Sequence, residues 1–432
     1  MLFLSHLVTL LPYKPKVRVN MSQISLPLDI DSLEILSQTV DTKGNIVIEI
    51  QSKTTSTPCH KCGKSATKRY GYGPYLMIRH LPILDTPVFL KIRPVRYQCE
   101  VCDDDPTTSE QYDWCDRGSK TSKGLDRYIM RNLIHSTVQD VSRKETISYR
   151  SLVSTLQRSV DYEVDWSDYK DLETIGIDEI SLKKGHCDFV TIVSVKNKSG
   201  ALSVIAVLPD RLKETVKAFF DSIPKTLKPT VRTVCSDMYD GFVQAAKEVF
   251  GSQVVVVDRY HVAKLYRAPL DKLRIEEMRR LTLELSTEEY ARLEGMMWVL
   301  RRDHECLSEA DKDKLCLLYK HSPKLKQAHK QALKLTNIFN TKCSRKVAQD
   351  KMNRWIRRVE NSTVTCFSTF IKTLKKHKTS ILNYFKARKS SGFVEGLNNK
   401  IKVLTRRCYG FFKPVSLFQR MQLDLKGFDM YA

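Results

Sequence analysis

The feature that most constrains the fold of this chain is a pair of closely spaced cysteine knuckles. The motifs CHKC and CEVC, with 36 residues between them, supply four thiols: Cys59, Cys62, Cys99 and Cys102. Four thiolates is the number that a tetrahedral structural zinc requires. Between the knuckles, YLMIRHLPI and PVFLKIRPVRYQ predict two strands joined by a turn around Leu84–Pro87. The pattern predicts a zinc ribbon within residues 25–118, with a redox pair or incidental cysteines as the alternatives.

The other cysteines and the N-terminus indicate a reduced, folded chain. The eight cysteines outside the knuckles have no paired spacing, so we interpret them as small apolar residues in a cytosolic protein. The apolar opening stretch lacks a basic leader and a cleavage site, so we do not interpret it as a signal peptide. A more polar stretch begins at Met21, a candidate start of the protein, and residues 1–24 are predicted to be a flexible extension. No run of about 18 apolar residues occurs, and no membrane partner is expected.

The net charge indicates a polyanionic partner. The 432 residues carry a formal charge of +23, while an apolar content of 42% is typical of a folded protein. Residues 341–432 concentrate this charge, with 21 Lys and Arg against 5 Asp and Glu. Self-repulsion of this kind costs folding free energy unless an anion relieves it, and nucleic acid is the usual polyanion. A basic surface that is only solvated is the alternative.

A segment with helical spacing, residues 119–165, follows the cysteine module. SKGLDRYIMRNLIHS, VQDVSRK and SYRSLVSTLQRSV space their apolar residues as helices do, and Ser148 is a candidate N-cap. A short helix, a turn and a second helix predict a helix-turn-helix whose recognition helix spans 149–158 and carries Arg150. Three packed helices without a DNA role are the alternative.

Two strands that end in an aspartate mark residues 171–266. ETIGID ends at Asp178 and TVRTVCSD ends at Asp237, while DFVTIVSV and ALSVIAVLP predict two further strands split by a turn at Asn197–Gly200. Helical patterns occupy 211–223 and YDGFVQAAKEVFG, and QVVVVDRYHVAKLY opens as a fifth strand. Three consecutive strands followed by alternating helices and strands predict an α/β fold with a ribonuclease-H-like catalytic core.

Paired carboxylates at the ends of neighbouring strands have a chemical use. Adjacent carboxylates repel, so Asp178 and Asp237 together cost stability unless a cation lies between them. Mg²⁺ prefers carboxylate oxygens, and two such ions about 3.5–4 Å apart serve a phosphodiester displacement. The alternative is that each aspartate only terminates its strand. Two acids in this order, within a basic chain, favour a metal site.

A third acid is expected from the C-terminal end of the chain. Residues 267–388 are mostly helical in pattern and too long for a loop, which predicts a helical insertion, and residues 389–432 then complete the core. In SGFVEGLNNKIKVLTRR the single acid, Glu395, lies beside an apolar helical face formed by Val394, Leu397, Ile401 and Leu404. We therefore expect this segment to return Glu395 to the two aspartates.

Six landmarks together resemble one known family. They are CHKC, CEVC, IGIDE, CSDMYDGF, VVVDRYHVAKL and VEGLNNKIKVLTRRCYGF, of which the last is the most specific. From about residue 25 onward the chain resembles insertion-sequence transposases of the DDE type, in the ISL-three family. The resemblance implies a prokaryotic, cytoplasmic, nucleoid-associated enzyme in which Asp178, Asp237 and Glu395 are the catalytic acids and hold two Mg²⁺ ions, with Mn²⁺ as a substitute. One departure is Ser391, where relatives often carry Asn.

Further residues are candidates for the site and for DNA contact. Asp258 and His261 in VVVDRYHVAKL are accessory candidates, although a histidine near a strand end is usually structural. Cations expected to bind phosphates follow Glu395 or lie in the N-terminal modules: Lys400, Lys402, Arg406, Arg407, Lys64, Arg69 and Arg150. The expected partners are double-stranded DNA, as terminal inverted repeats and target, and a second copy of the chain, because synapsis of two ends requires at least a dimer.

Two other functions stay open. A transposase-derived regulator would bind DNA with an inactive nuclease fold, but all three acids are present in this chain. A ribonuclease-H-like nuclease would hydrolyse DNA without joining it. The family-specific terminal motif and the N-terminal DNA-reading modules favour the transposase over both.

Overall fold

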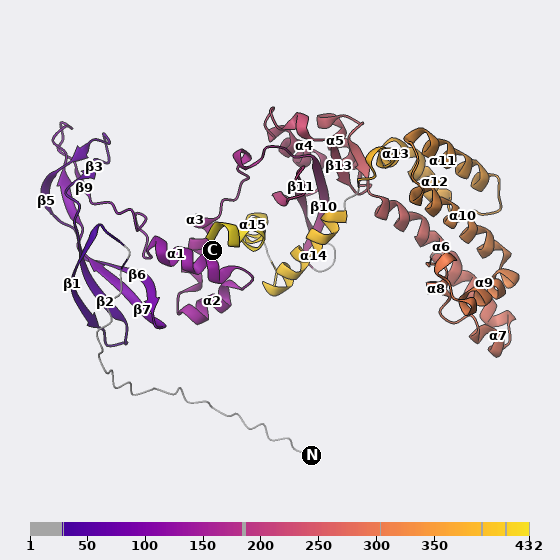
Figure 1. Cartoon of the computed structure of the whole chain (residues 1–432), viewed down its shortest axis with the longest axis horizontal. Helices are drawn as coiled ribbons and strands as arrows, with labels where there is room; N and C mark the ends of the chain where they lie inside the picture. Colours follow the sequence, from indigo (N-terminus) through magenta and orange to yellow (C-terminus); the bar gives the residue numbers. More distant parts are fainter. Residues whose placement is uncertain are drawn as a thin grey trace, which may run out of the picture. The chain divides into compact units, whose positions relative to one another are not determined.

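The computed structural model describes residues 28, 30–183, 187–302, 304–389, 392–410 and 413–431. The predicted extension 1–24 and Ser391 lie outside the described residues. The chain divides into two compact units, Met1–Asp126 and Arg127–Ala432 (Figure 1). The division falls inside the predicted connector 119–165 rather than at its edge.

The first unit contains a four-stranded sheet in the order β1-β2-β7-β6. Its strands are β1 (Leu33–Val40), β2 (Ile46–Ser52), β6 (Leu76–Ile83) and β7 (Thr86–Ile92). Alternate residues of β2 and β7 are buried, including Ile48, Ile50, Val88 and Leu90, which form the core of this sheet. The predicted turn between β6 and β7 is confirmed by positive φ angles at Leu84 (46°) and Asp85 (62°).

The cysteine knuckles adjoin two smaller sheets of the same unit. These are a β3-β4 pair and a sheet ordered β5-β8-β9, built from β3 (Thr57–Pro58), β4 (Ser65–Ala66), β5 (Lys68–Tyr72), β8 (Val95–Gln98) and β9 (Thr107–Ser109). The prediction of one strand over PVFLKIRPVRYQ is wrong, because the chain breaks at Arg93–Pro94 and continues into another sheet. Proline has no N–H for the ladder. The hairpin β6-β7 therefore belongs to the larger sheet.

Three helices lead into the second unit: α1 (Lys123–Leu133), α2 (Val138–Glu145) and α3 (Tyr149–Ser159). The predicted N-cap is confirmed, because the Ser148 side chain accepts a hydrogen bond from the Ser151 N–H. Between α2 and α3 the chain turns through Thr146, which adopts a left-handed conformation with φ 50°. The described residues therefore contain the predicted helix, turn and helix.

The centre of the second unit is a five-stranded mixed sheet in the order β12-β11-β10-β13-β14. Its strands are β10 (Thr174–Lys183), β11 (Cys187–Lys196), β12 (Leu202–Leu208), β13 (Thr233–Ser236) and β14 (Val255–Val257). The first three strands are antiparallel, and β10, β13 and β14 are parallel. This confirms the predicted succession of strands, with α4 (Lys213–Ser222) and α5 (Asp240–Phe250) between the later ones.

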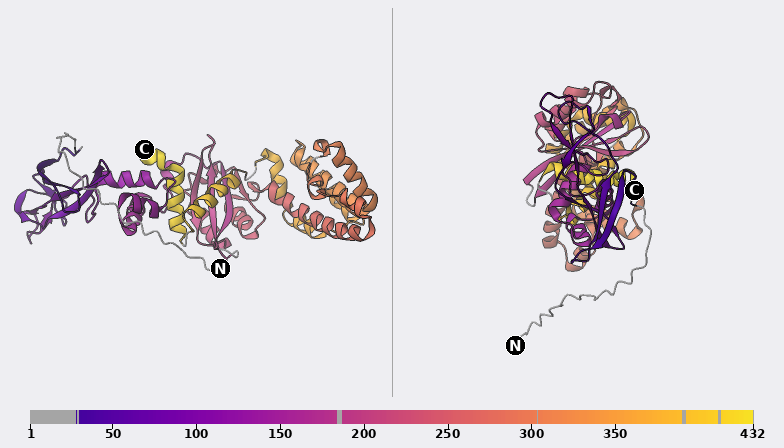
Figure 2. Two further views of the ribbon diagram at one scale, coloured as in Figure 1. Left: turned by 90° about the horizontal axis from the view of Figure 1, so that it is seen from below. Right: turned by 90° about the vertical axis from the view of Figure 1, so that its left-hand side faces the viewer.

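Each face of this sheet packs against its own helices. Ile175 and Ile177 of β10 share a core with Val216 and Phe220 of α4. On the opposite face, Ile180 shares a core with α14 (Gly392–Arg407) and α15 (Pro414–Tyr431), and both helices cross in front of the sheet in the left view of Figure 2. Side chains alternate along a strand, so Gly176 and Asp178 lie on the α14 face with Ile180.

A helical region separates β14 from α14, as the sequence predicts. It comprises α6 (Arg259–Glu284), α7 (Thr287–Ala291), α8 (Met296–Val299), α9 (Glu309–His321), α10 (Pro323–Asn340), α11 (Arg345–Glu360), α12 (Ser368–Lys376) and α13 (Lys378–Ala387). Short 3₁₀ turns occur at Trp166–Asp168, Lys228–Thr230 and His304–Cys306. The first helix begins directly after β14, eight residues before the predicted boundary at 267, and runs through Pro269. Its buried residues join the core beneath α4 and α5.

Candidate active site

Helix α14 lies close against β10 because β10 carries a glycine at the contact. A methyl group placed on Gly176 would meet the Val394 Cγ2 atom at 2.2 Å and the Phe393 Cζ atom at 2.9 Å. Both of these side chains belong to the first turn of α14. The Ser194 hydroxyl of the neighbouring strand β11 donates a hydrogen bond to the Gly176 carbonyl (3.2 Å) and lies on the same face as α14. Gly176 therefore sets the height of α14 over the sheet.

The two predicted aspartates lie level on neighbouring strands. Gly176 is in register with Cys235 across β10 and β13, so Asp178 is level with Asp237, which follows β13. Such strands are about 4.8 Å apart. Burial raises the pKa of both carboxyl groups, and the charge of Asp237 contributes to the increase at Asp178. The prediction that Asp178 ends its strand is wrong, because β10 continues to pair with β11 through Ser181↔Phe189.

The accessory candidates come from the junction of β14 and α6. Ser236 is in register with Val257, so Asp258 is level with Asp237 on the next strand. Asp258 is buried, and its carboxylate accepts the Tyr260 N–H (2.7 Å) as the N-cap of α6. His261, in the first turn of α6, lies close enough to the aspartates for its charge to lower the pKa of both. The sequence placed both residues at this junction, and the cap gives Asp258 a structural use.

The third acid, Glu395, lies in the first turn of α14 and is exposed. One turn further on, the buried Asn398 donates a hydrogen bond from Nδ2 to Asp178 Oδ2. Residues three apart lie on neighbouring positions of one helix face. Glu395 therefore lies one helical turn from the residue that contacts Asp178, and among the described residues no bond joins the two carboxylates.

Asn398 is the residue whose role the sequence did not assign. Only 6% of its surface is exposed, and its Oδ1 atom is buried without a hydrogen-bond partner. A buried acceptor with no donor carries a free-energy cost of about 1–3 kcal/mol. The motif Glu-Gly-Leu-Asn-Asn placed an amide one turn from Glu395, but the phase of α14 against β10 decides which amide reaches Asp178.

The oxygen-rich donor set suits a hard divalent cation. Two half-buried carboxylates on neighbouring strands repel each other, and an unpartnered amide oxygen lies beside them. Carboxylate and amide oxygens are the ligands that Mg²⁺ and similar ions take. Asp178, Asp237 and Glu395 do not all bring an oxygen within 4.8 Å of one another, since among the described residues only the cysteine cluster meets that criterion.

The four cysteines of the first unit form that cluster. The Sγ atoms of Cys59, Cys62, Cys99 and Cys102 all lie within 4.8 Å of one another. Cys62 and Cys99 are separated by 3.7 Å between sulfurs, and Cys99 and Cys102 by 3.8 Å. A tetrahedral zinc with bonds of about 2.3 Å requires sulfurs roughly 3.8 Å apart. Backbone N–H groups of Cys62 and Lys61 lower the pKa of the Cys59 thiol to about 6, while the neighbouring sulfurs raise the pKa of Cys102 to about 12, so the four thiols share their protons.

The cations expected to contact DNA are exposed, with one exception. Arg407 is half-buried and forms an ion pair with Asp424 of α15. The exposed ones lie beside the cysteine cluster, on α3 and on α14: Lys64, Arg69, Arg150, Lys400, Lys402 and Arg406. The guanidinium of Arg407 therefore serves the packing of α14 on α15.

A tyrosine and arginine surface in the first unit was not predicted. Tyr70 and Tyr72 of β5 are 61% and 52% exposed, and Arg96 and Arg93 lie 5.6 Å and 5.2 Å from their ring centroids. Lys91 lies 4.4 Å from the exposed Tyr75 ring. Rings and cations side by side suit a nucleic-acid backbone with its bases. The alternating tyrosines of KRYGYGPY are the signal in the sequence.

The fold and the acids together indicate a DDE-type enzyme, and comparison with known families agrees. A family model for ISL-three (ISL3) DDE transposases, described as "Transposase", matches residues 175–421, from β10 into α15. This is more than half of the chain, and the chain belongs to that transposase family.

Two relatives resemble the chain over most of their length. A transposase for insertion sequence element IS1001 from Bordetella parapertussis is 24% identical over 372 residues, covering 85% of this chain and 89% of the relative. A transposase for insertion sequence element IS1557 from Mycobacterium tuberculosis is 24% identical over 398 residues, covering 86% and 87%. Within the described part of the chain, no helix has the length and apolar character needed to cross a membrane.

Proposed function

We propose that this transposase binds the terminal inverted repeats of an insertion sequence and catalyses metal-dependent strand cleavage and strand transfer. The catalytic acids in this proposal are Asp178, Asp237 and Glu395, on a ribonuclease-H-like core. The observation that carries it is the level pair of half-buried aspartates beneath α14, where Asn398 contacts Asp178 one turn from Glu395.

The three acids are the proposed ligands for two Mg²⁺ ions, with Mn²⁺ as a substitute. When bound, such ions activate the attacking oxygen and stabilise the leaving oxygen of a phosphodiester displacement. The protein contributes positioning: β10 and β13 hold the two aspartates, and the Gly176 contact holds α14 above them. Burial gives the aspartates an environment in which each charge interaction is strong.

The proposed DNA-binding groups lie in both units. In the first unit the zinc-bound cysteine cluster would hold Lys64 and Arg69 toward backbone phosphates. In the second, Arg150 of α3 would read DNA, and the exposed cations of α14 would contact the strand near the acids: Lys400, Lys402 and Arg406. Two element ends require at least a dimer in the synaptic complex. A cytoplasmic, nucleoid-associated protein is the setting that such a reaction implies.

The test is a cleavage and joining assay with the full chain. The substrate is a duplex carrying the terminal repeat that flanks the gene, mixed with supercoiled target DNA and Mg²⁺ or Mn²⁺. Glu395→Gln and Asp237→Asn should abolish cleavage while leaving DNA binding in chelator intact. Asp221→Asn, which removes an exposed carboxylate of α4, is the matched control and should keep full activity.

The two alternative functions give different results in this assay. If the wild-type chain binds ends but never cuts them with either ion, the DNA-binding regulator is correct. If it cuts ends but never joins them to target DNA, the hydrolytic nuclease is correct. If Glu395→Gln retains both steps, Glu395 is not a catalytic acid and the assignment of the three acids is wrong.

A further inference from the structure

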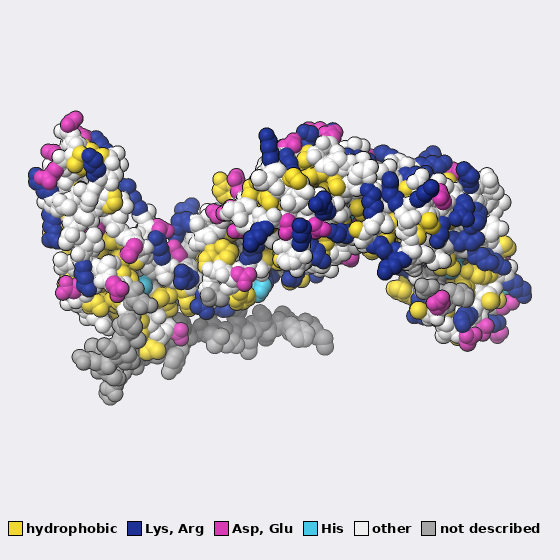
Figure 3. Space-filling view, turned by 45° about the horizontal axis from the view of Figure 1, so that its top comes forward, with side chains coloured by type: hydrophobic (Ala, Val, Ile, Leu, Met, Phe, Trp, Pro, Cys, Tyr) yellow, Lys and Arg dark blue, Asp and Glu magenta, His cyan; other side chains and the backbone are white. Residues whose placement is uncertain are grey.

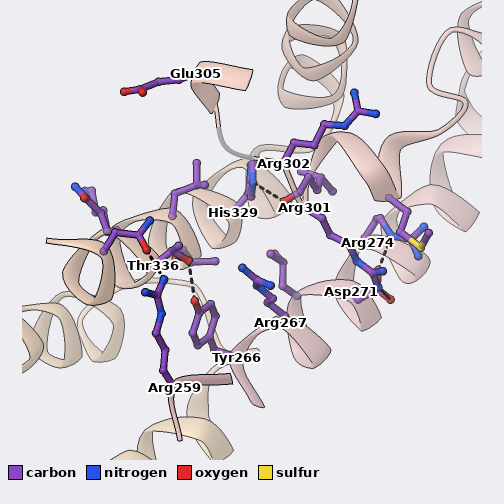
Figure 4. Close-up of a pocket in the computed structure, with 18 residues that line it drawn as sticks. Arg259, Tyr266, Arg267, Asp271, Arg274, Arg301, Arg302, Glu305, His329 and Thr336 are labelled. Carbon is purple, nitrogen blue, oxygen red and sulfur yellow. Dashed lines mark hydrogen bonds and ion pairs between the residues drawn. The ribbon is translucent and has the colours of Figure 1, made fainter. Parts of the chain in front are cut away.

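A cavity in the helical region is lined by charged side chains, most of which are arginines. It has a volume of about 600 Å³ and lies between α6, α8 and α10 (Figure 4). Two lining side chains are acidic, Asp271 and Glu305, and six are cationic: Arg259, Arg267, Arg274, Arg301, Arg302 and Lys334. Four of these cations, Arg267, Arg301, Arg302 and Lys334, are exposed, so the excess of positive charge is open to a partner from solvent.

Internal partners occupy some of these cations but not all. Asp271 accepts the Arg274 Nε–H (2.8 Å) and also pairs with Arg301 at 3.4 Å. Arg267 and Lys334 have no hydrogen bond or ion pair with any described residue, and the Arg267 side chain extends into the cavity in Figure 4. The cavity therefore presents cationic donors that the fold itself does not use.

The rest of the lining suits more than a bare ion. Apolar side chains of α6 and α10, including Leu270 and Leu333, lie beside the polar side chains of Thr336 and Asn337. A volume of about 600 Å³ falls within the roughly 300–1,000 Å³ range of sites that enclose small organic ligands. This lining suits a phosphate group carried on a sugar. The arginines would bind the anionic oxygens of the phosphate, and the leucines would contact the less polar sugar.

Helix α6 connects this cavity to the proposed active site. The helix begins at the sheet edge, where His261 lies near the paired aspartates. Arg267 follows six residues later, a rise of about 9 Å at 1.5 Å per residue. Arg274 lies seven residues further on, at a spacing that keeps it on nearly the same side of the helix. One continuous helix thus carries cations away from the acids and into the cavity.

We infer that this arginine cavity binds phosphate groups of a DNA strand that extends from the active site. The inference rests on the proposed function, and it adds a DNA contact that lies in the helical region. Lys and Arg side chains gather over the surface of that region in Figure 3. The cavity lies beside a cationic surface, and helix α6 connects it to the proposed site of phosphodiester cleavage. Both features favour a DNA strand over a free nucleotide as the ligand.

The experiment measures binding without chemistry. The full chain, in chelator, is titrated against a fluorescent duplex carrying the terminal repeat, at several salt concentrations. Arg267→Glu and Lys334→Glu are the test variants. Arg279→Glu is the matched control, because Arg279 is an exposed arginine of the same helix that does not line the cavity. Thermal denaturation of all variants confirms that each is folded.

Each phosphate contact contributes about 0.9 to the slope of log affinity against log salt for duplex DNA. Between 50 and 200 mM salt, the affinity of a variant that lacks one contact should therefore fall about 3.5-fold less than that of the wild type, and the affinity of a variant that lacks two should fall about 12-fold less. We expect Arg267→Glu and Lys334→Glu each to lower the slope by about one and to weaken binding at low salt. Arg267→Gln should lower the slope similarly without the added repulsion, and Arg279→Glu should bind as the wild type does.

The outcomes separate this site from its rivals. Equal weakening by Arg267→Glu and Arg279→Glu indicates diffuse attraction and overturns the inference. The inference is also overturned if Arg267→Glu no longer binds ATP or inorganic phosphate but binds DNA as the wild type does, because the cavity then binds a free anion. If the wild type does not cleave DNA but Arg267→Glu still weakens DNA binding selectively, the cavity is a DNA contact and the proposed cleavage activity is wrong.

Discussion

Gly176→Ala tests whether the contact between β10 and α14 determines the active-site geometry. The new methyl group would lie 2.2 Å from Val394 Cγ2, 2.9 Å from Phe393 Cζ and 2.9 Å from Ser194 Oγ. Carbon atoms in contact normally lie about 3.5–4.0 Å apart. Valine in a helix has one strongly preferred rotamer, so Val394 cannot rotate away. The helix itself must move by about 1 Å or more.

The magnitude follows from the overpacking and from the catalytic geometry. Inserting a methyl group into a packed interior costs about 1–3 kcal/mol, which should appear as a lower denaturant midpoint with an unchanged slope. A displacement of about 1 Å at a reacting group reduces rates by roughly a hundredfold. We therefore expect Gly176→Ala to lose about 1–3 kcal/mol of stability and about a hundredfold in the rate of strand cleavage.

Two further variants make the result specific. Gly396→Ala places a methyl on the same helix where no atom lies within 4 Å, so it should stabilise the chain by up to about 1 kcal/mol through helix propensity. Combining Gly176→Ala with Val394→Ala removes the tightest contact and should recover part of both losses, as a double-mutant cycle. Wild-type stability and cleavage in Gly176→Ala alone would refute the reasoning.

Three other predictions concern the metal sites. Asn398→Leu removes both the donor to Asp178 and a buried oxygen that has no partner, so thermal denaturation should show little change in the free energy of unfolding. Cleavage kinetics should show that Mg²⁺-dependent cleavage falls about 10–100-fold. In chelator, Asp237→Asn should raise Tm, because the burial that raises the pKa of Asp237 makes its charge destabilising at neutral pH. Glu395→Gln should leave Tm unchanged. Mg²⁺ at a hundred times Kd should add about 2.7 kcal/mol to the free energy of unfolding of the wild type and nothing to that of Asp237→Asn. A strong zinc chelator should lower the stability of the first unit alone, and Cys102→Ser should reduce its zinc content in elemental analysis; a chain purified at full stability without zinc would contradict the cluster's proposed role.

Local patterns predicted much of this fold because local forces determine those parts. The Ser148 cap and the turn at Leu84 follow from backbone groups within a few residues. The apolar face of α14 follows from helical periodicity, and Val394 and Leu397 are both buried as predicted. The succession of strands in the second unit follows from runs of β-branched residues, which few other structures accommodate.

The differences arise where distant segments meet. Whether β10 stops at Asp178 depends on its pairing with β11, and the alternation of Ile180 and Leu182 after Asp178 is the strand signal that the prediction missed. Pro94 was a visible signal for a break in the strand, but which sheet β8 then joins depends on its pairing with the distant β5 and β9. The hydrogen bond from Asn398 depends on the rotation of α14, and the contact between Gly176 and Val394 sets that rotation across more than two hundred residues of sequence.

The three proposed catalytic acids occupy different environments, and the difference explains how the metal-free chain can carry all three. Asp178 and Asp237 are held in place by buried strands, and burial raises the pKa of both, so their charges oppose folding. Glu395 is exposed in the first turn of a helix, where water and the helix dipole accommodate a negative charge at little cost. The rigid pair therefore fixes the position of the site, while the solvated acid can join it without a large desolvation penalty in the metal-free protein. A third carboxylate enclosed as Asp178 and Asp237 are would have added to the repulsion at the sheet edge.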